Sequence, residues 1–129
     1  MIKEIEVLNQ VNEYLNNQGF FYKNEVNFLE RKIDVIGVKN KKVIAIEVKV
    51  RNWKKALQQA ITCKLCSHYV YVAFWHKYLP KNLSIFENYG IGVMSVNGFV
   101  EIVNKPKKSK IVHEKLLNAI LKQIGEKND

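Results

Sequence analysis

Two carboxylates and one amine stand in a part of the sequence where core side chains would be expected. The segment IDVIGVKNKKVIAIEVKV contains Asp34, Glu47 and Lys49 among β-branched and apolar residues. The stretches 32–38 and 42–50 are typical of buried strands. Acids at the end of such strands could bind a divalent cation and act on a phosphate.

A short turn between the two strands would bring the acids together. If Asn40 and Lys41 are the turn residues, the antiparallel ladder continues until Asp34 lies opposite Glu47. Directly opposed residues on one face have Cβ atoms about 4.5–5.5 Å apart. Lys49 follows on the same face as Glu47, because side chains alternate along a strand. A slip of one residue would turn one acid away.

Two carboxylates at this distance repel one another unless a positive charge lies between them. Lys49 supplies one charge, and Mg²⁺ or Mn²⁺ would supply more, since hard oxygen ligands suit these ions. The lysine would then orient a water or stabilise developing negative charge. The alternative is a partly exposed cluster of ion pairs that protects a sheet edge.

The remaining pattern predicts one α/β domain with the order αβββαβ and later additions. We expect a restriction-endonuclease-like core, a mixed central sheet flanked by helices, at 1–104. A basic linker and helix follow at 105–129, packed on the domain or on a dimer partner. The other expected elements are a helix over 3–18 with Ile5, Leu8, Val11 and Leu15 on one face, a strand over 20–30, a helix over 52–65 capped by Asn52, a strand over 68–74, a short helix over 82–90, a hairpin turned by Asn97 and Gly98, and an amphipathic helix over 111–125.

The formal net charge of +9 favours polyanionic partners such as nucleic acid, although it also serves general solubility. Lysine dominates the positive charge, with Arg31 and Arg51 as the only arginines. No stretch of the sequence is long and apolar enough to span a bilayer, and the charged beginning MIKEIEVLNQ does not resemble a secretion signal. We therefore expect a soluble, cytoplasmic protein without a membrane partner.

Other residues with chemical potential lack the spacing of a site. Cys63 and Cys66 have no second cysteine pair to complete a zinc site, so we expect two small residues on a packed helix. The three histidines form no metal triad. Trp53, Trp75, Tyr78 and Tyr89 could stack on bases but more often such residues fill a core. The segment KPKKSK at 105–110 either follows a DNA backbone or is a solvated hinge.

Asp34, twelve residues, and then Glu47-Val48-Lys49 resemble the D…ExK signature of the PD-(D/E)xK nucleases, the restriction-endonuclease-like superfamily. The order of elements around the signature is also similar to that superfamily's αβββαβ core. The resemblance covers roughly 3–74 and is nearest to small archaeal-type Holliday junction resolvases.

The resemblance implies roles for individual residues. Asp34 and Glu47 would hold the metal, with the backbone carbonyl of Val48 as a further ligand. Lys49 would be the catalytic lysine, and Gln59 in the following helix would support the site. Arg51 and Asn52, with Lys54 and Lys55 beside them, are expected to bind nucleic acid.

Two departures from the family pattern stand out. Ile33 takes the place of the proline before the first acid. Junction resolvases carry a metal-binding glutamate in the first helix, and the matching position here holds Asn9. Glu6 and Glu13 are on either side of it and could present a carboxylate to the metal, or could simply solvate the helix surface.

We therefore expect a Mg²⁺-dependent DNA endonuclease, with Mn²⁺ as a possible substitute. A junction-resolving enzyme is the first choice, and a restriction or repair nuclease follows. An RNA-processing nuclease, or a DNA-binding module that no longer cuts, are the alternatives. A symmetric substrate would favour a homodimer.

Overall fold

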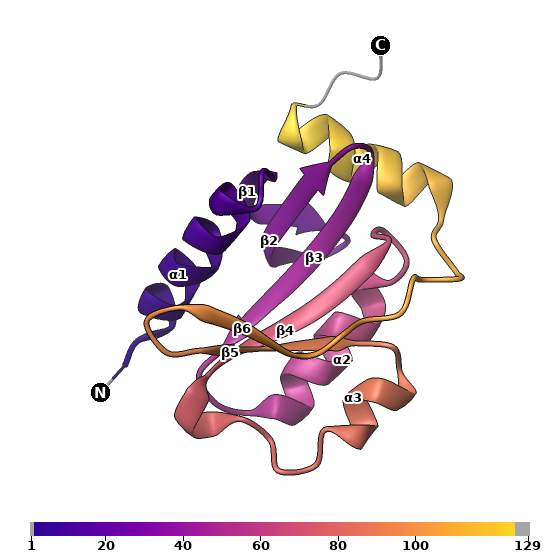
Figure 1. Ribbon diagram of the computed structural model, residues 1–129. Coiled ribbons are helices and arrows are strands. Elements are labelled where there is room, and N and C mark those ends of the chain that lie inside the picture. Colours follow the sequence, from indigo (N-terminus) through magenta and orange to yellow (C-terminus); the bar gives the residue numbers. More distant parts are fainter. Residues whose placement is uncertain (1, 126–129) are drawn as a thin grey trace.

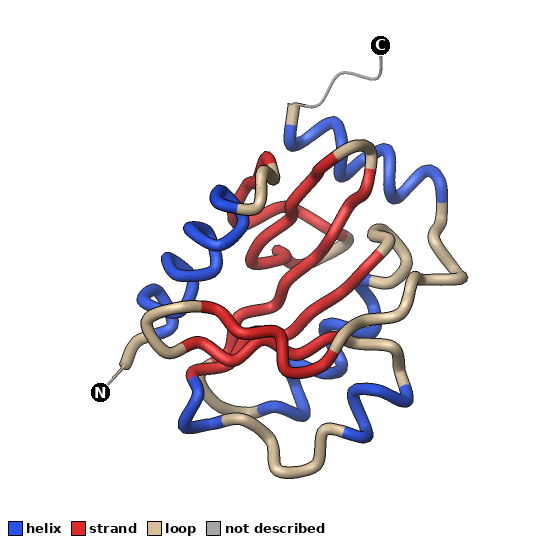
Figure 2. Tube along the Cα trace, in the orientation of Figure 1, coloured by secondary structure: helices blue, strands red, loops and turns tan. Residues whose placement is uncertain are grey.

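Six strands form one mixed sheet in the computed structural model, which describes residues 2–125 (Figures 1 and 2). No helix in this range is long and apolar enough to cross a membrane. The elements are α1 (Glu4–Asn17), β1 (Phe21–Phe28), β2 (Arg31–Lys39), β3 (Lys42–Lys49), α2 (Trp53–Cys63), β4 (Tyr69–Trp75), the 3₁₀ turn η1 (His76–Tyr78), α3 (Ser84–Asn88), β5 (Gly92–Val96), β6 (Val100–Asn104) and α4 (Glu114–Ile124).

The strands lie side by side in sequence order, from β1 to β6. β1, β2 and β3 form an antiparallel meander, β4 and β5 run parallel to β3, and β6 returns antiparallel to β5. The helix α2 makes the crossover between β3 and β4 that a parallel pair needs. The predicted αβββαβ order and mixed sheet are confirmed.

Helices cover both faces of the sheet, and each face has its own apolar cluster. On one face α1 packs through Val7, Val11 and Leu15. On the other face α2 and α4 pack against strand residues such as Val43 and Val72. Burial on both faces explains why the central strands are almost continuously apolar.

The β2–β3 hairpin has the predicted register. Asn40 and Lys41 form the turn with φ values of 50° and 65°, and Lys39 pairs with Lys42. Positive φ at both turn residues matches the twist of the two strands. Regular pairing continues from there as far as Val35 opposite Ile46, which is one step before the two acids.

The regular pleat of β1 and β2 is broken at Glu25 and Asp34. The ladder pairs Asn24 with Val35 and Val26 with Ile33, so the pair between them is skipped. Glu25 has a φ of 53°, far from extended backbone. The break reverses which side chains face α2.

The effect of this break is visible in the core. Ile33 and Ile36 belong to the same apolar cluster, on the α2 face, although three residues apart in an unbroken strand would point to opposite faces. On β1, Tyr22 packs with the α1 cluster, whereas Val26 and Phe28 pack on the α2 face. A prediction that assumes strict alternation of side chains along β1 and β2 therefore misses the point where the strands change the face they present to α2.

Two helix predictions need correction. The buried stripe of α1 contains Val7, whereas Ile5 is 54% exposed, because the three buried residues follow a spacing of four that leaves Ile5 on the side of the helix. The last helix begins at Glu114, and Ile111 is exposed. The segment before α4 instead runs along the domain, where Ser109 N donates to the carbonyl of His68 at 2.8 Å.

The predicted turn at Asn97 and Gly98 exists, but its loop has three residues. Val96 pairs with Val100, and Gly98 has a φ of 77°. Cys63 is the last residue of α2, as expected, whereas Cys66 lies in the turn that follows the helix; both are buried free thiols.

The facing of α1 can be tested with a pair of substitutions. Val7→Ala removes fully buried methyl groups and should lower the free energy of unfolding by about 2 kcal/mol. Ile5→Ala should change it by less than about 0.5 kcal/mol, because Ile5 is exposed. Urea denaturation of both variants measures the difference. A larger loss for Ile5→Ala would contradict the observed packing.

Candidate active site

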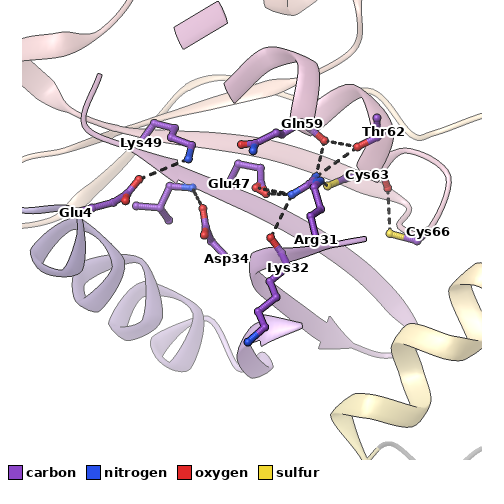
Figure 3. Close-up of polar contacts among 11 residues, drawn as sticks. Glu4, Arg31, Lys32, Asp34, Glu47, Lys49, Gln59, Thr62, Cys63 and Cys66 are labelled. Carbon is purple, nitrogen blue, oxygen red and sulfur yellow. Dashed lines mark hydrogen bonds and ion pairs between the residues drawn. The ribbon is translucent and has the colours of Figure 1, made fainter. Parts of the chain in front are cut away.

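The Glu47 carboxylate is buried in the sheet with a side-chain exposure of 1%. It projects from β3 toward α2, and Arg31 Nη1 donates to its Oε1 at 2.8 Å (Figure 3). A carboxylate removed from water in this way requires a cation or several donors nearby. Arg31 is the cation that contacts Glu47 directly in the described structure.

Asp34 lies where the β2–β3 ladder ends. Its Oδ2 accepts a hydrogen bond from the backbone N–H of Val48 at 2.7 Å, in place of the strand–strand bond that would have continued (Figure 3). The carboxylate therefore lies at the opening that is left where the β2–β3 ladder ends. The N–H and C=O of one strand residue point to the same side, so the Val48 carbonyl also faces this opening.

Lys49 completes the group at the end of β3. Its Nζ lies 3.8 Å from Glu4 Oε1 at the beginning of α1, and its side chain is 23% exposed. Its positive charge also acts on Asp34 and on Glu47. The acid–acid–lysine arrangement expected from the sequence is thus present as a cluster at one end of the sheet.

Burial dominates the acid–base behaviour of both carboxyls. It raises the pKa of Glu47 to about 7, the nearby Asp34 charge adds to the increase, and Arg31 and Lys49 oppose it. Burial also raises the pKa of Asp34, against the hydrogen bond from Val48 and the charges of Lys49 and Arg31. Near neutral pH the Glu47 carboxyl is therefore partly protonated.

Arg31 ties the site to α2. Its Nη2 donates to the carbonyl of Gln59 at 2.8 Å and also contacts Thr62 Oγ1 and Cys63 Sγ, at 3.3 and 3.1 Å. Burial raises the pKa of the Cys63 thiol well above its usual range, so this contact is to a neutral sulfur. Arg31 thereby holds Glu47 at a fixed distance from the helix.

Gln59 carries an unused acceptor. Its side-chain Oε1 is buried and has no hydrogen-bond partner within residues 2–125. In Figure 3 the amide end of Gln59 points toward the space between Lys49 and Glu47. Gln59 therefore lies beside the acidic cluster with an acceptor free for a ligand or a water.

The structure does not bring Glu6 and Glu13 into this cluster. Glu6 accepts a hydrogen bond from the Lys3 backbone at the start of α1, and Glu13 lies beside the β5–β6 turn near Phe99. The acid that α1 does present to the site is Glu4.

Glu25 is a further acidic neighbour, and its charge raises the pKa of Asp34. Within residues 2–125 no three His, Cys, Asp or Glu side chains are grouped so that they alone could hold a metal ion.

The candidate nucleic-acid contacts follow directly after β3. Arg51, Asn52, Lys54 and Lys55 are exposed. Arg51 stacks on Tyr78, with its guanidinium 5.0 Å from the ring centroid. Asn52 has a φ of 61° and its side chain accepts from the Lys55 N–H, which confirms the expected cap of α2.

Arg31 is the site residue that sequence reasoning missed. In an unbroken strand it would face away from Asp34, three positions later. The break at Asp34 turns both Arg31 and Ile33 to the α2 face. The available signal was composition, since Arg31 is one of only two arginines in a chain rich in lysine.

Comparison with solved structures shows the fold alone. SPO1766, a protein of unknown function from Silicibacter pomeroyi, matches with a TM-score of 0.72 and 17% identity, over 96% of this chain and 85% of that one. SfsA from Pyrococcus furiosus, solved with Ca²⁺, is more distant, with a TM-score of 0.43 and 13% identity over 75% and 59% of the two chains. No protein-family model and no curated protein matches the sequence.

The raised pKa of Glu47 predicts a loss of stability between pH 6 and 7. The folded chain still binds much of this proton in that range, whereas an unfolded glutamate is already ionised, so stability falls as the pH rises toward the folded-state pKa of about 7 and levels off above it. The expected loss is about 1 kcal/mol. Urea denaturation at both pH values should show it for the parent chain and not for Glu47→Gln. The same change of unfolding free energy with pH in the parent chain and in Glu47→Gln would contradict the raised pKa of Glu47.

Proposed function

We propose that this protein is a metal-dependent nuclease that hydrolyses phosphodiester bonds in DNA. The observation that carries the proposal is the cluster of Asp34, Glu47 and Lys49, brought together at the opening of the sheet. The D…ExK spacing and the αβββαβ order support the same conclusion through their resemblance to PD-(D/E)xK nucleases. The net charge of +9 supports a polyanionic substrate.

The donor set suits a hard divalent cation. Asp34 and Glu47 supply carboxylate oxygens, and the Val48 carbonyl faces the same opening. Mg²⁺ is commonly held by one or two carboxylates together with water and substrate oxygens, so a third acidic side chain is not required. When bound, the ion would supply Lewis acidity at a phosphoryl oxygen and lower the pKa of a water.

The remaining steps fall to the side chains. Lys49, beside both acids and partly exposed, would orient the attacking water and stabilise negative charge on the phosphate. Gln59 Oε1 is available to accept a hydrogen bond from that water. The water oxygen forms a bond to phosphorus, its proton passes to solvent, and the bond to the leaving sugar oxygen breaks as that oxygen takes up a proton.

Arg31 favours a second candidate, a DNA-binding module that does not cut. Together with Lys49 it balances the charges of Asp34 and Glu47 without any metal. A metal at Glu47 would have to share that carboxylate with Arg31 or displace Arg31 from it.

Within the nuclease class, junction resolution remains our first choice, and restriction, repair and RNA processing remain alternatives. The homodimer stays a prediction.

Cleavage of labelled DNA tests the proposal directly. Asp34→Ala, Glu47→Ala and Lys49→Ala should each lower the Mg²⁺-dependent rate at least about 100-fold, because each removes a group that acts on the reacting phosphate. The panel should contain single strands, duplexes, flaps and four-way junctions. Glu101→Ala, which removes an exposed acid on β6, is the matched control. Full activity in Glu47→Ala would exclude the mechanism.

Metal binding can be measured without any substrate. Mn²⁺ should raise the melting temperature of the parent chain, because a ligand that binds only the folded state stabilises it. The same ion should have little effect on Asp34→Asn. The shift should also grow from pH 6 to pH 8, since Glu47 must lose its proton to become a ligand. An absent shift, together with DNA binding that survives chelator, would favour the non-cutting module.

A further inference from the structure

A cavity lies on the α1 face of the sheet, away from the acidic cluster. It has a volume of about 300 Å³, within the range of small-ligand sites. We call it the tyrosine pocket, and the residues that define it are Tyr14, Phe20, Tyr69, Tyr71, Lys42 and Lys105. Lys42 and Glu47 lie near opposite ends of β3, five positions and about 17 Å apart. Their side chains point to opposite faces of the sheet, because an odd number of positions separates them.

Four aromatic rings from three parts of the chain meet at this pocket. Tyr14 comes from α1, Phe20 from the loop before β1, and Tyr69 and Tyr71 from β4. Burial raises the pKa of Tyr71, and the hydroxyls of Tyr14 and Tyr69 are near enough to add to it. The pocket therefore combines flat apolar walls with neutral hydroxyl groups, which suits an aromatic heterocycle.

Two glycines give these rings their room. A Cβ at Gly92 would lie 2.6 Å from Tyr71 Cδ2 and 2.8 Å from Pro106 Cδ. A Cβ at Gly37 would lie 3.2 Å from Phe20 Cδ2. The Tyr71 ring can rest against the sheet only because Gly92 carries no side chain, whereas a side chain at Gly37 would crowd Phe20 more mildly.

The mouth of the pocket is positively charged. Lys42 Nζ lies 5.7 Å from the ring centroids of both Phe20 and Tyr69, which holds it at the rim. A neighbouring hollow shares Lys42 and Tyr69 and adds Lys41 and Lys108. This continuous run of lysines complements a phosphate group beside an aromatic ring.

We infer that the tyrosine pocket binds a nucleotide, with the base among the tyrosine rings and the phosphate at Lys42 and Lys105. The nucleotide is either free or part of a single strand, since both present the same base and phosphate. Base–aromatic stacking does not depend on sequence, so any base is acceptable. The inference does not depend on the proposed nuclease activity, because the pocket shares no residue with the acidic cluster.

Chemical-shift mapping on the ¹⁵N-labelled chain tests the inference. Adenosine monophosphate, thymidine monophosphate and a short oligothymidylate are titrated separately, with inorganic phosphate as the charge-only probe. Binding of a nucleotide should shift the amides of Ile44, Tyr69 and Met94, which line the pocket. Shifts from mononucleotides identify a free-nucleotide site, and shifts from the oligomer alone identify a site for a strand.

Variants decide whether the binding belongs to this pocket. Tyr69→Ala and Lys42→Glu should each weaken it about tenfold or more. Lys115→Glu makes the same charge change on an exposed position of α4 and should not. Lys42 is exposed, so its variant keeps the test valid even if Tyr69→Ala fails to fold.

Three results would overturn the inference: no shifts with any nucleotide, the same shifts with inorganic phosphate, or affinity unchanged in Lys42→Glu. Asp34→Ala separates the two proposals. Nucleotide binding should persist in that variant, while loss of cleavage there concerns only the nuclease site.

Discussion

The arrangement of the site depends on one buried charge, the carboxylate of Glu47. The interior of a sheet cannot accommodate an isolated anion, so the surrounding chain must supply positive charge. Arg31 does so from the start of β2 and extends to α2, while Lys49 does so from the same strand. A chain with two arginines places one of them here. Burial and a neighbouring acid nevertheless leave the carboxyl easily protonated near neutral pH.

The break at Glu25 and Asp34 makes this arrangement possible. It ends the regular ladder, so that the Asp34 carboxylate takes over the N–H of Val48, and it turns Arg31 onto the face of Glu47. The Asp34 carboxylate and the Val48 backbone lie together at this opening. Local irregularity beside a reactive group is frequent in sheets, because it redirects side chains without changing the fold. β2 and β3 are interior strands of the six-stranded sheet, so this cluster is not a row of ion pairs along an edge strand.

The two ends of β3 contribute to two different groups of side chains, and these groups lie on opposite faces of the sheet. At one end, facing α2, acids and bases share a small volume and suit a cation with a phosphate. At the other, facing α1, aromatic rings and lysines surround a cavity and suit a base with its phosphate. Both proposed sites would attract a polyanionic ligand, as would the net charge of +9. Gly92 on β5 leaves the room that the Tyr71 ring takes up in the second site.

The sequence by itself determined the order of the elements, the β2–β3 turn and its register, the cap of α2, and the clustering of Asp34, Glu47 and Lys49. These features depend on local periodicity and turn chemistry, which short stretches encode. Only the tertiary structure decided that Arg31 faces Glu47, that Val7 and not Ile5 is buried, and that tyrosines distant in sequence share a pocket. Each of these outcomes depends on a change of strand face or on contacts between separate elements, and periodicity along one segment carries no information about either.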